Sequence, residues 1–341
     1  MTPKVSIVMP IFNHSKEMLE NAINSILNQT FKDFELILVD GSSNNRNFEI
    51  ISTIKDRRIK YFKTKGYVNC LNIGIEHSRG IYIARMESDD ISFQTRIEEQ
   101  VAFLDTNPQI DVCSCRVEYF GANNKISPNN KELTLFNLIK CQEIVHTAIM
   151  FRKNINVKYK NVKPLEDCLL FRELIINGYK LSIINKVLMK NHVSPNSIMM
   201  TYPKYCNFLI SKINIFALSK YYNFNLSFID KLLFAKSFSK QEIFEYLNFI
   251  LFLKQKLKRT NLKLTEISLP LFSYMISKHK DKYFIFKNKL FYQTILLLYL
   301  EMLVKSIPQF LFSSKNKWIK NKKIKIICIC GIKLKFKIKE I

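Results

Sequence analysis

Several features that would indicate particular protein classes are scarce or missing in this sequence. No apolar run reaches the roughly 18 residues that a membrane-spanning helix needs, because Glu301 interrupts the run 294–304. The apolar run 5–12 is too short for a signal peptide and contains a proline. The 8 cysteines include no C-x-x-C pair, so we expect reduced thiols and neither disulfides nor a zinc site. From these absences we expect a cytoplasmic protein.

Acidic residues are scarce in the last part of the chain. Residues 201–341 contain 27 Lys and Arg against 7 Asp and Glu, whereas residues 1–200 contain 26 against 21. An excess of positive charge favours an anionic partner, either a membrane surface or a nucleic acid. A general lysine bias in the source organism would produce the same excess without such a function.

The first 200 residues alternate between strand-like and helix-like segments. The chain has 341 residues, of which 48% are hydrophobic, so it can form two domains with sizeable cores. Such alternation predicts an α/β fold, with a mostly parallel sheet and helices on both faces. The apolar patterns predict strands at 5–10, 34–39, 59–62, 81–86, 112–120, 144–151 and 181–189, and helices at 18–28, 46–54, 67–78, 95–106 and 164–177.

From Tyr202 onward the pattern changes to apolar and aromatic residues with lysines at intervals. The helices expected there span about 203–220, 226–237, 240–257, 264–280 and 284–306. Lysine then alternates with apolar residues from 323 to 338, which predicts a two-stranded ribbon. The predicted organisation is a catalytic domain over 1–200, a basic, aromatic-rich helical region over 201–322, and a lysine-rich β-hairpin tail over 323–341.

Three carboxylates follow the strand at 81–86, in the run Arg85-Met86-Glu87-Ser88-Asp89-Asp90. Like charges so close together repel each other unless a cation neutralises them. In open α/β sheets, ligands bind outside the carboxyl ends of the strands. The run therefore predicts a divalent metal that grips a diphosphate. A solvated acidic turn is the alternative interpretation.

Further motifs occur in a fixed order along residues 3–200. They are 5–13 (VSIVMPIFN), 29–35 (QTFKDFE), 39–43 (VDGSS), 71–75 (LNIGI), 80–92 (GIYIARMESDDIS), 96–100 (RIEEQ), 146–152 (HTAIMFR), 166–167 (ED) and 194–197 (SPNS). In their order and spacing the chain resembles the family 2 glycosyltransferases of the bacterial surface-polysaccharide type. That resemblance implies the GT-A fold and a nucleotide-sugar donor, with UDP as the expected nucleotide.

The resemblance also implies roles for individual residues on the donor side. Asp89 matches the usual ligand of Mg²⁺ or Mn²⁺, and Glu87 stands in the place of the usual first aspartate, where it contacts metal or ribose. Gly41 stands where the family often has a second aspartate. The residues implied to bind the donor are Pro10, Phe12, Asp40, Arg85, Glu87 and Ser88.

Alternatives stay open for three of these donor-side residues. Phe12 either stacks on the base or packs in the core. Arg85 either holds the diphosphate or forms a structural ion pair with Glu87 or Asp90. Asp90 itself either caps its loop or orients Arg96.

On the acceptor side, the resemblance implies that Asp167 is the general base, with Glu166 beside it. The pattern alone would explain both carboxylates as charge compensation at a helix N-terminus. One in-line attack by a deprotonated hydroxyl inverts the anomeric centre. His146 either lines the acceptor side or is a core residue, and His192 stands where relatives usually carry arginine.

Three functions compete. The first is an inverting, metal-dependent glycosyltransferase that acts on a glycan or lipid-linked acceptor in surface-polysaccharide synthesis. It would sit peripherally on the inner face of the cytoplasmic membrane, with no nucleic-acid partner, and a homodimer stays open. The second is a nucleotidyltransferase, which the loop 10–15 disfavours because it has neither glycine nor arginine. The third is a basic membrane- or nucleic-acid-binding protein with a vestigial sugar-nucleotide site.

Overall fold

The computed structural model describes residues 2–121, 124–128, 133–140, 144–227, 232–233, 239–257, 312–319, 322–329 and 332–337. It divides into two compact units, Met1–Tyr222 and Asn223–Ile341. The predicted helices at 264–280 and 284–306 lie outside the described residues, as does most of the one at 226–237. The domain boundary at residue 200 stays a prediction, and the first compact unit continues through helix α8 (Pro203–Tyr221).

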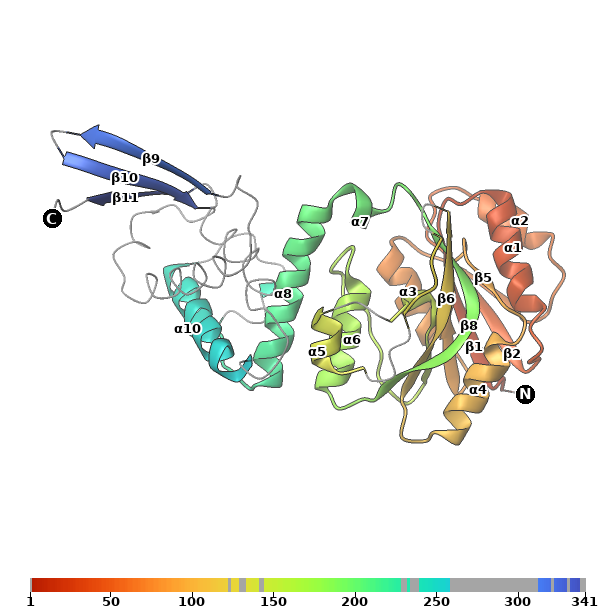
Figure 1. Cartoon of the computed structure of the whole chain (residues 1–341). Coiled ribbons are helices and arrows are strands. Elements are labelled where there is room, and N and C mark those ends of the chain that lie inside the picture. The colour runs from red at the N-terminus through yellow and green to blue at the C-terminus, as the bar shows by residue number, and fades with distance from the viewer. Residues whose placement is uncertain are drawn as a thin grey trace. The chain divides into compact units, whose positions relative to one another are not determined.

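An eight-stranded mixed sheet forms the centre of the first unit (Figure 1). Strands β3, β2, β1 and β4 are parallel neighbours, as the β/α alternation predicted. Strands β7 and β5 join antiparallel to their neighbours. The order across the sheet is β3 (Ile59–Lys63), β2 (Phe34–Asp40), β1 (Val5–Ile11), β4 (Tyr82–Arg85), β7 (Met150–Arg152), β6 (Val112–Gly121), β8 (Leu181–Val193) and β5 (Ile91–Ser92).

Helices cover both faces of this sheet (Figure 1). Because successive strand residues point to opposite faces, β1 contributes Val5, Ile7 and Met9 to one core and Val8 to the other. The helices on the first face are α1 (Lys16–Leu27), α2 (Arg46–Ser52) and α4 (Arg96–Thr106), and those on the second are α3 (Tyr67–Glu76), α5 (Leu135–Lys140) and α6 (Glu166–Ile176).

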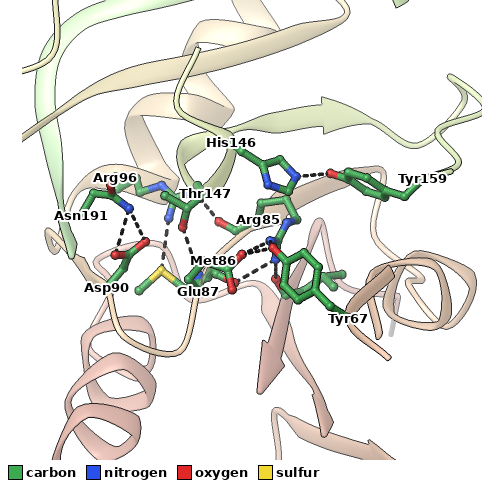
Figure 2. Close-up of polar contacts among 11 residues, drawn as sticks. Tyr67, Arg85, Met86, Glu87, Asp90, Arg96, His146, Thr147, Tyr159 and Asn191 are labelled. Carbon is green, nitrogen blue, oxygen red and sulfur yellow. Dashed lines mark hydrogen bonds and ion pairs between the residues drawn. The ribbon is translucent and has the colours of Figure 1, made fainter. Parts of the chain in front are cut away.

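Helix α3 lies especially close to the sheet. A Cβ atom added at Gly74 would lie 2.3 Å from Cγ1 of Val8, so only glycine fits at this crossing. The close approach fixes the N-terminal end of α3, where Tyr67 points toward the end of β4 (Figure 2).

The strand predicted at 144–151 is wrong over most of its length. Residues His146–Ala148 form a 3₁₀ turn, and β7 has only three residues. Side chains of α4 take the carbonyls that a strand would use: Arg96 Nη2 donates to Thr147 O at 3.2 Å, and Gln100 Nε2 donates to Ala148 O at 2.8 Å.

The second unit contains helix α10 (Lys240–Lys256), whose N-terminus is closed by a capping box of Ser239 and Glu242. It also contains a three-stranded antiparallel sheet of β9 (Phe312–Ile319), β10 (Lys322–Ile329) and β11 (Ile332–Lys337). The predicted ribbon is confirmed by the β10–β11 pairing. The assignment of 312–319 to the helical region was wrong, because these residues form β9. The strand was not predicted because its sequence lacks the alternation of lysine and apolar residues seen in β10 and β11. Within the described residues, no helix combines the length and apolarity that crossing a membrane requires.

Candidate active site

The predicted site residues gather at the edge of the sheet where β1, β2 and β4 end. Strands β1, β2 and β4 run parallel, so their carboxyl ends meet at this edge. The run Met86–Asp90 continues directly from β4 and turns back toward β8. Figure 2 shows polar groups on both sides of Met86: one around Arg85, Glu87 and Tyr67, the other around Asp90 and Asn191.

Arg85 is the centre of the first group, and its side chain has no exposed surface. Its guanidinium forms an ion pair with Glu87 and donates from Nη2 to the Tyr67 hydroxyl at 3.1 Å. The Tyr67 hydroxyl also donates to Glu87. The structure therefore contains the structural ion pair with Glu87 that the sequence left open for Arg85, and a role of Arg85 in holding the diphosphate stays a prediction. Burial raises the pKa of Glu87, even though Arg85 beside it acts in the opposite direction.

Asp90 is the centre of the second group and is completely buried. Both of its carboxylate oxygens accept from Asn191 Nδ2, at 3.0 and 2.9 Å, and Oδ1 also accepts from the backbone N–H of His192 at 2.7 Å. Asp90 therefore fastens its loop to β8. Burial, and Asp89 beside it, raise the pKa of Asp90 to about 7. Arg96 hydrogen-bonds elsewhere, since its Nη2 donates to Arg85 O at 2.6 Å.

Asp89 points to the other side of the same loop. Its side chain is 19% exposed, and its Oδ2 lies 3.1 Å from Nδ1 of His192. The His192 ring packs against Phe120, with ring centroids 5.2 Å apart. Glu87 and Asp89 thus differ in their partners and not in their exposure: Glu87 is held by Arg85 and Tyr67 and is 21% exposed, whereas Asp89 contacts only His192 in the described part of the chain and is 19% exposed.

Glu166 and Asp167 lie in the first turn of α6, and Glu166 interacts electrostatically with Glu87 and Tyr67 of the first group. Glu166 is 8% exposed, and its buried Oε2 has no hydrogen-bond partner among the described residues. Burial raises the pKa of Glu166 to about 7, with Asp167 and Glu87 as further causes. Asp167 accepts the backbone N–H of Cys168 at 2.7 Å, and burial raises its pKa. Glu87 therefore affects the pKa of Glu166, although the two residues are about 80 positions apart in the sequence.

His146 is a buried polar residue near Arg85 and Tyr159. Its Nε2 lies 2.6 Å from the Tyr159 hydroxyl. Burial, with Arg85 nearby, lowers the pKa of His146 well below its ordinary value, so the imidazole is neutral at pH 7. Figure 2 shows His146 and Tyr159 beside Arg85.

The residues predicted for nucleotide binding differ in accessibility. Phe12, just after β1, is 52% exposed. Pro10 and Ser88 are buried, and the Ser88 hydroxyl has no partner among the described residues. Asp40 is completely buried and accepts from Ser42 Oγ at 2.6 Å, Asn47 Nδ2 at 3.0 Å and Tyr61 OH at 2.9 Å.

Gly41 has a close neighbour. A Cβ atom at this position would lie 2.9 Å from Sγ of Cys70 on α3. The space beside Asp40 is therefore filled by the Cys70 side chain.

Sequence reasoning missed Tyr67, Thr147, Tyr159 and Asn191. Tyr67 had a signal, because it opens a predicted helix directly after Gly66, which has a φ of 87°. Thr147 joins the two groups, since its hydroxyl accepts the Glu87 N–H at 3.0 Å and its side chain also hydrogen-bonds to Asp90. Such contacts between distant segments leave no local pattern.

Comparison with known proteins identifies the family of this chain. A family model described as Glycosyl transferase family 2 matches residues 6–165. An uncharacterized glycosyltransferase of Methanocaldococcus jannaschii is 34% identical over 209 residues, which cover 57% of this chain and 72% of that protein. The putative glycosyltransferase EpsE of Bacillus subtilis is 34% identical over 160 residues, 44% of this chain and 56% of that protein.

Solved structures share the fold at lower identity. The crystal structure of S. aureus TarS 1–349 in complex with UDP has a TM-score of 0.56 and 16% identity, and the match covers 98% of both chains. The same protein in complex with UDP-GlcNAc also has a TM-score of 0.56, with 98% of this chain and 99% of that chain covered. The chain therefore belongs to glycosyl transferase family 2, and it is a glycosyltransferase with a GT-A fold.

Proposed function

We propose that this glycosyltransferase is an inverting, metal-dependent enzyme that moves a sugar from a UDP donor to a hydroxyl of a glycan or lipid-linked acceptor. The observation that supports this most is the electrostatic coupling between Glu87, just beyond the carboxyl end of β4, and Glu166 in the first turn of α6. The complexes of TarS with UDP and UDP-GlcNAc are the reason to propose uridine as the base.

Asp89 and His192 are the residues that would hold the metal. A carboxylate oxygen and an imidazole nitrogen 3.1 Å apart form a donor set that suits Mn²⁺, and the carboxylate also suits Mg²⁺. Among the described residues, no cluster of three or more His, Cys, Asp or Glu side chains could hold a metal. The remaining positions would thus be left to phosphate oxygens and water. When bound, the cation would neutralise the diphosphate leaving group as a Lewis acid.

The other residues bind, orient and accept a proton. Phe12 offers its exposed ring to stack on the base. Asp167 accepts the proton of the acceptor hydroxyl, and its raised pKa makes it a stronger base near neutral pH. Glu166 is placed to hydrogen-bond a sugar hydroxyl, which would satisfy its partnerless Oε2. A single displacement by the deprotonated hydroxyl inverts the anomeric centre.

Calorimetric titration of the full chain with UDP-GlcNAc and Mn²⁺ tests the proposal. We expect binding that EDTA abolishes and that Asp89→Asn weakens at least tenfold, because the variant loses a charged ligand. Asp167→Asn should keep donor affinity within about twofold and lose transfer. Metal-independent binding that Asp89→Asn does not change would contradict the proposal.

We also propose that the enzyme works at the cytoplasmic face of a membrane, where lipid-linked acceptors are found. The support is the charge of residues 201–341, with 27 Lys and Arg against 7 Asp and Glu. Each Lys near an anionic leaflet contributes about 1 kcal/mol to binding. Homodimer formation through this region is the competing proposal.

A further inference from the structure

A basic groove lies at the edge of the sheet opposite the candidate active site. Two cavities of about 920 and 570 Å³ open there, and Arg79 lines both of them. Their lining residues come from the starts of β1 to β4 and from the end of β7, which is antiparallel to β4. Since β1 and β2 have 7 residues each, the active-site edge is roughly 20 Å away. The groove is therefore separate from the site described above.

Positive charge is concentrated in this groove. Eight Lys or Arg residues line the two cavities, against three carboxylates. The excess of five equals the difference between the 26 basic and 21 acidic residues of the whole segment 1–200. The remaining surface of that segment is therefore neutral on balance, and a lysine-rich composition alone would spread the excess more evenly.

Two guanidinium groups in the groove are fixed in place. Arg79 donates from Nη2 and Nε to Oε2 of the buried Glu35, at 2.7 and 2.9 Å. Arg58 forms a two-point ion pair with Asp56, at 3.0 and 2.7 Å, and lies 4.4 Å from the ring centroid of Phe34. Fixed guanidinium groups lose little conformational entropy when they bind a planar or tetrahedral anion.

Three further cations are left for a ligand. Lys32, Arg57 and Lys60 are exposed at the larger cavity, and within the described parts of the chain none makes a hydrogen bond or ion pair through its side chain. The groove thus combines two guanidinium groups held by carboxylates with three exposed cations beside them.

We propose that this groove binds an anionic carbohydrate chain that carries phosphate or carboxylate groups at intervals. Two cavities that meet at Arg79 suit an extended ligand better than one small anion. The aromatic residues of the lining, Phe34 and Tyr82, are 4% and 3% exposed, so the groove lacks the stacking surfaces that single-stranded nucleic acids use. The anion site rests on this geometry, and the choice of a carbohydrate rests on the proposed function.

Lysine acetylation footprinting of the full chain, read by mass spectrometry, tests the site without interference from the basic region 201–341. The probe is a heparin octasaccharide. We expect the labelling rates of Lys32 and Lys60 to fall at least threefold, while exposed Lys125 is unchanged. Because screening shortens the range of such interactions, 0.5 M NaCl should remove the protection.

Matched charge reversals complete the test. Arg57→Glu should restore the labelling of Lys32 and Lys60, and Lys125→Glu should not. Unchanged labelling with heparin in the wild type, or full protection in Arg57→Glu, would overturn the site. Equal protection by an octamer of thymidylate would overturn the carbohydrate assignment. Manganese-dependent UDP-GlcNAc binding should be the same in the wild type and in both variants. Its absence from the wild type, with protection by heparin intact, would contradict the proposed function and leave the groove unaffected.

Discussion

At the scale of single residues, buried carboxylates set the pH response of the active site. The Glu166 carboxyl titrates at about 7 in the folded chain, against an ordinary value of 4.5. Between these values the unfolded chain releases a proton that the folded chain keeps, so the contribution of Glu166 to the free energy of unfolding falls as the pH rises. The difference corresponds to about 3 kcal/mol at most.

The first prediction therefore concerns Glu166→Gln. The free energy of unfolding of the wild type should fall between pH 5 and pH 8, and that of the variant should not fall with it, because the amide cannot become charged. The difference between the variant and the wild type should therefore shift in favour of the variant by up to about 3 kcal/mol over this pH range. Urea unfolding followed by circular dichroism at both pH values measures this. A difference that does not change with pH would show that the carboxyl titrates normally.

Candidate site residues could be selected from the sequence only where a motif marks them. The carboxylates at 87–90 and 166–167 were selected because motif order marks them, and their roles stay predictions. The choice between the two interpretations of Arg85 was not predictable from the sequence, because it depends on how Tyr67 and Glu87 contact the guanidinium in the folded chain. Asp40 likewise has its acceptors occupied by Ser42, Asn47 and Tyr61, which no local pattern around Asp40 indicates.

At the scale of secondary-structure elements, the contact of α3 with β1 positions Tyr67 and hence Glu87. Gly74→Ala places a methyl group into Val8, and overpacking of this kind typically costs 1–3 kcal/mol. We expect Val8→Ala to relieve the clash, so that the double variant loses at least about 1 kcal/mol less than the sum of the single variants. Denaturant unfolding of the four proteins gives this coupling, and strict additivity would contradict it.

Helices and strands were predicted correctly where the apolar pattern of the sequence determines them. The prediction failed where hydrogen bonds from distant side chains determine the backbone conformation. Strands β1, β2 and β4 follow apolar runs. Helix α1, expected at 18–28, spans Lys16–Leu27, and Ser15 caps it by accepting the Met18 N–H on Oγ at 3.2 Å. The segment 144–151 is apolar enough for a strand, yet Arg96 and Gln100 donate to its carbonyls from positions 51 and 48 residues earlier in the chain.

At the scale of the whole molecule, helix α8 belongs to the first compact unit. Arg172 on α6 is buried and donates from Nε to Oδ1 of Asn214 on α8 at 2.9 Å. A fragment 1–200 would leave that donor unpaired, which costs about 1–3 kcal/mol before any lost packing is counted. We expect 1–222 to melt at least about 5 °C above 1–200. Equal melting temperatures in thermal unfolding would place the boundary at 200.

The membrane proposal also belongs to this scale. Co-sedimentation with phosphatidylglycerol vesicles should retain the full chain and release 1–222, because most of the positive charge lies beyond that residue. Phosphatidylcholine vesicles are the control and should retain neither protein. Equal partitioning of the two proteins on the anionic vesicles would refute the proposal.

The contact between Gly41 and Cys70 limits which side chains position 41 can carry. An aspartate introduced at 41 would meet a sulfur atom 2.9 Å from its Cβ, so the Cys70 side chain must move to make room for it. A smaller residue at 70 removes that obstacle. A second acidic group beside Asp40 is thus best introduced as the pair Gly41→Asp and Cys70→Ala.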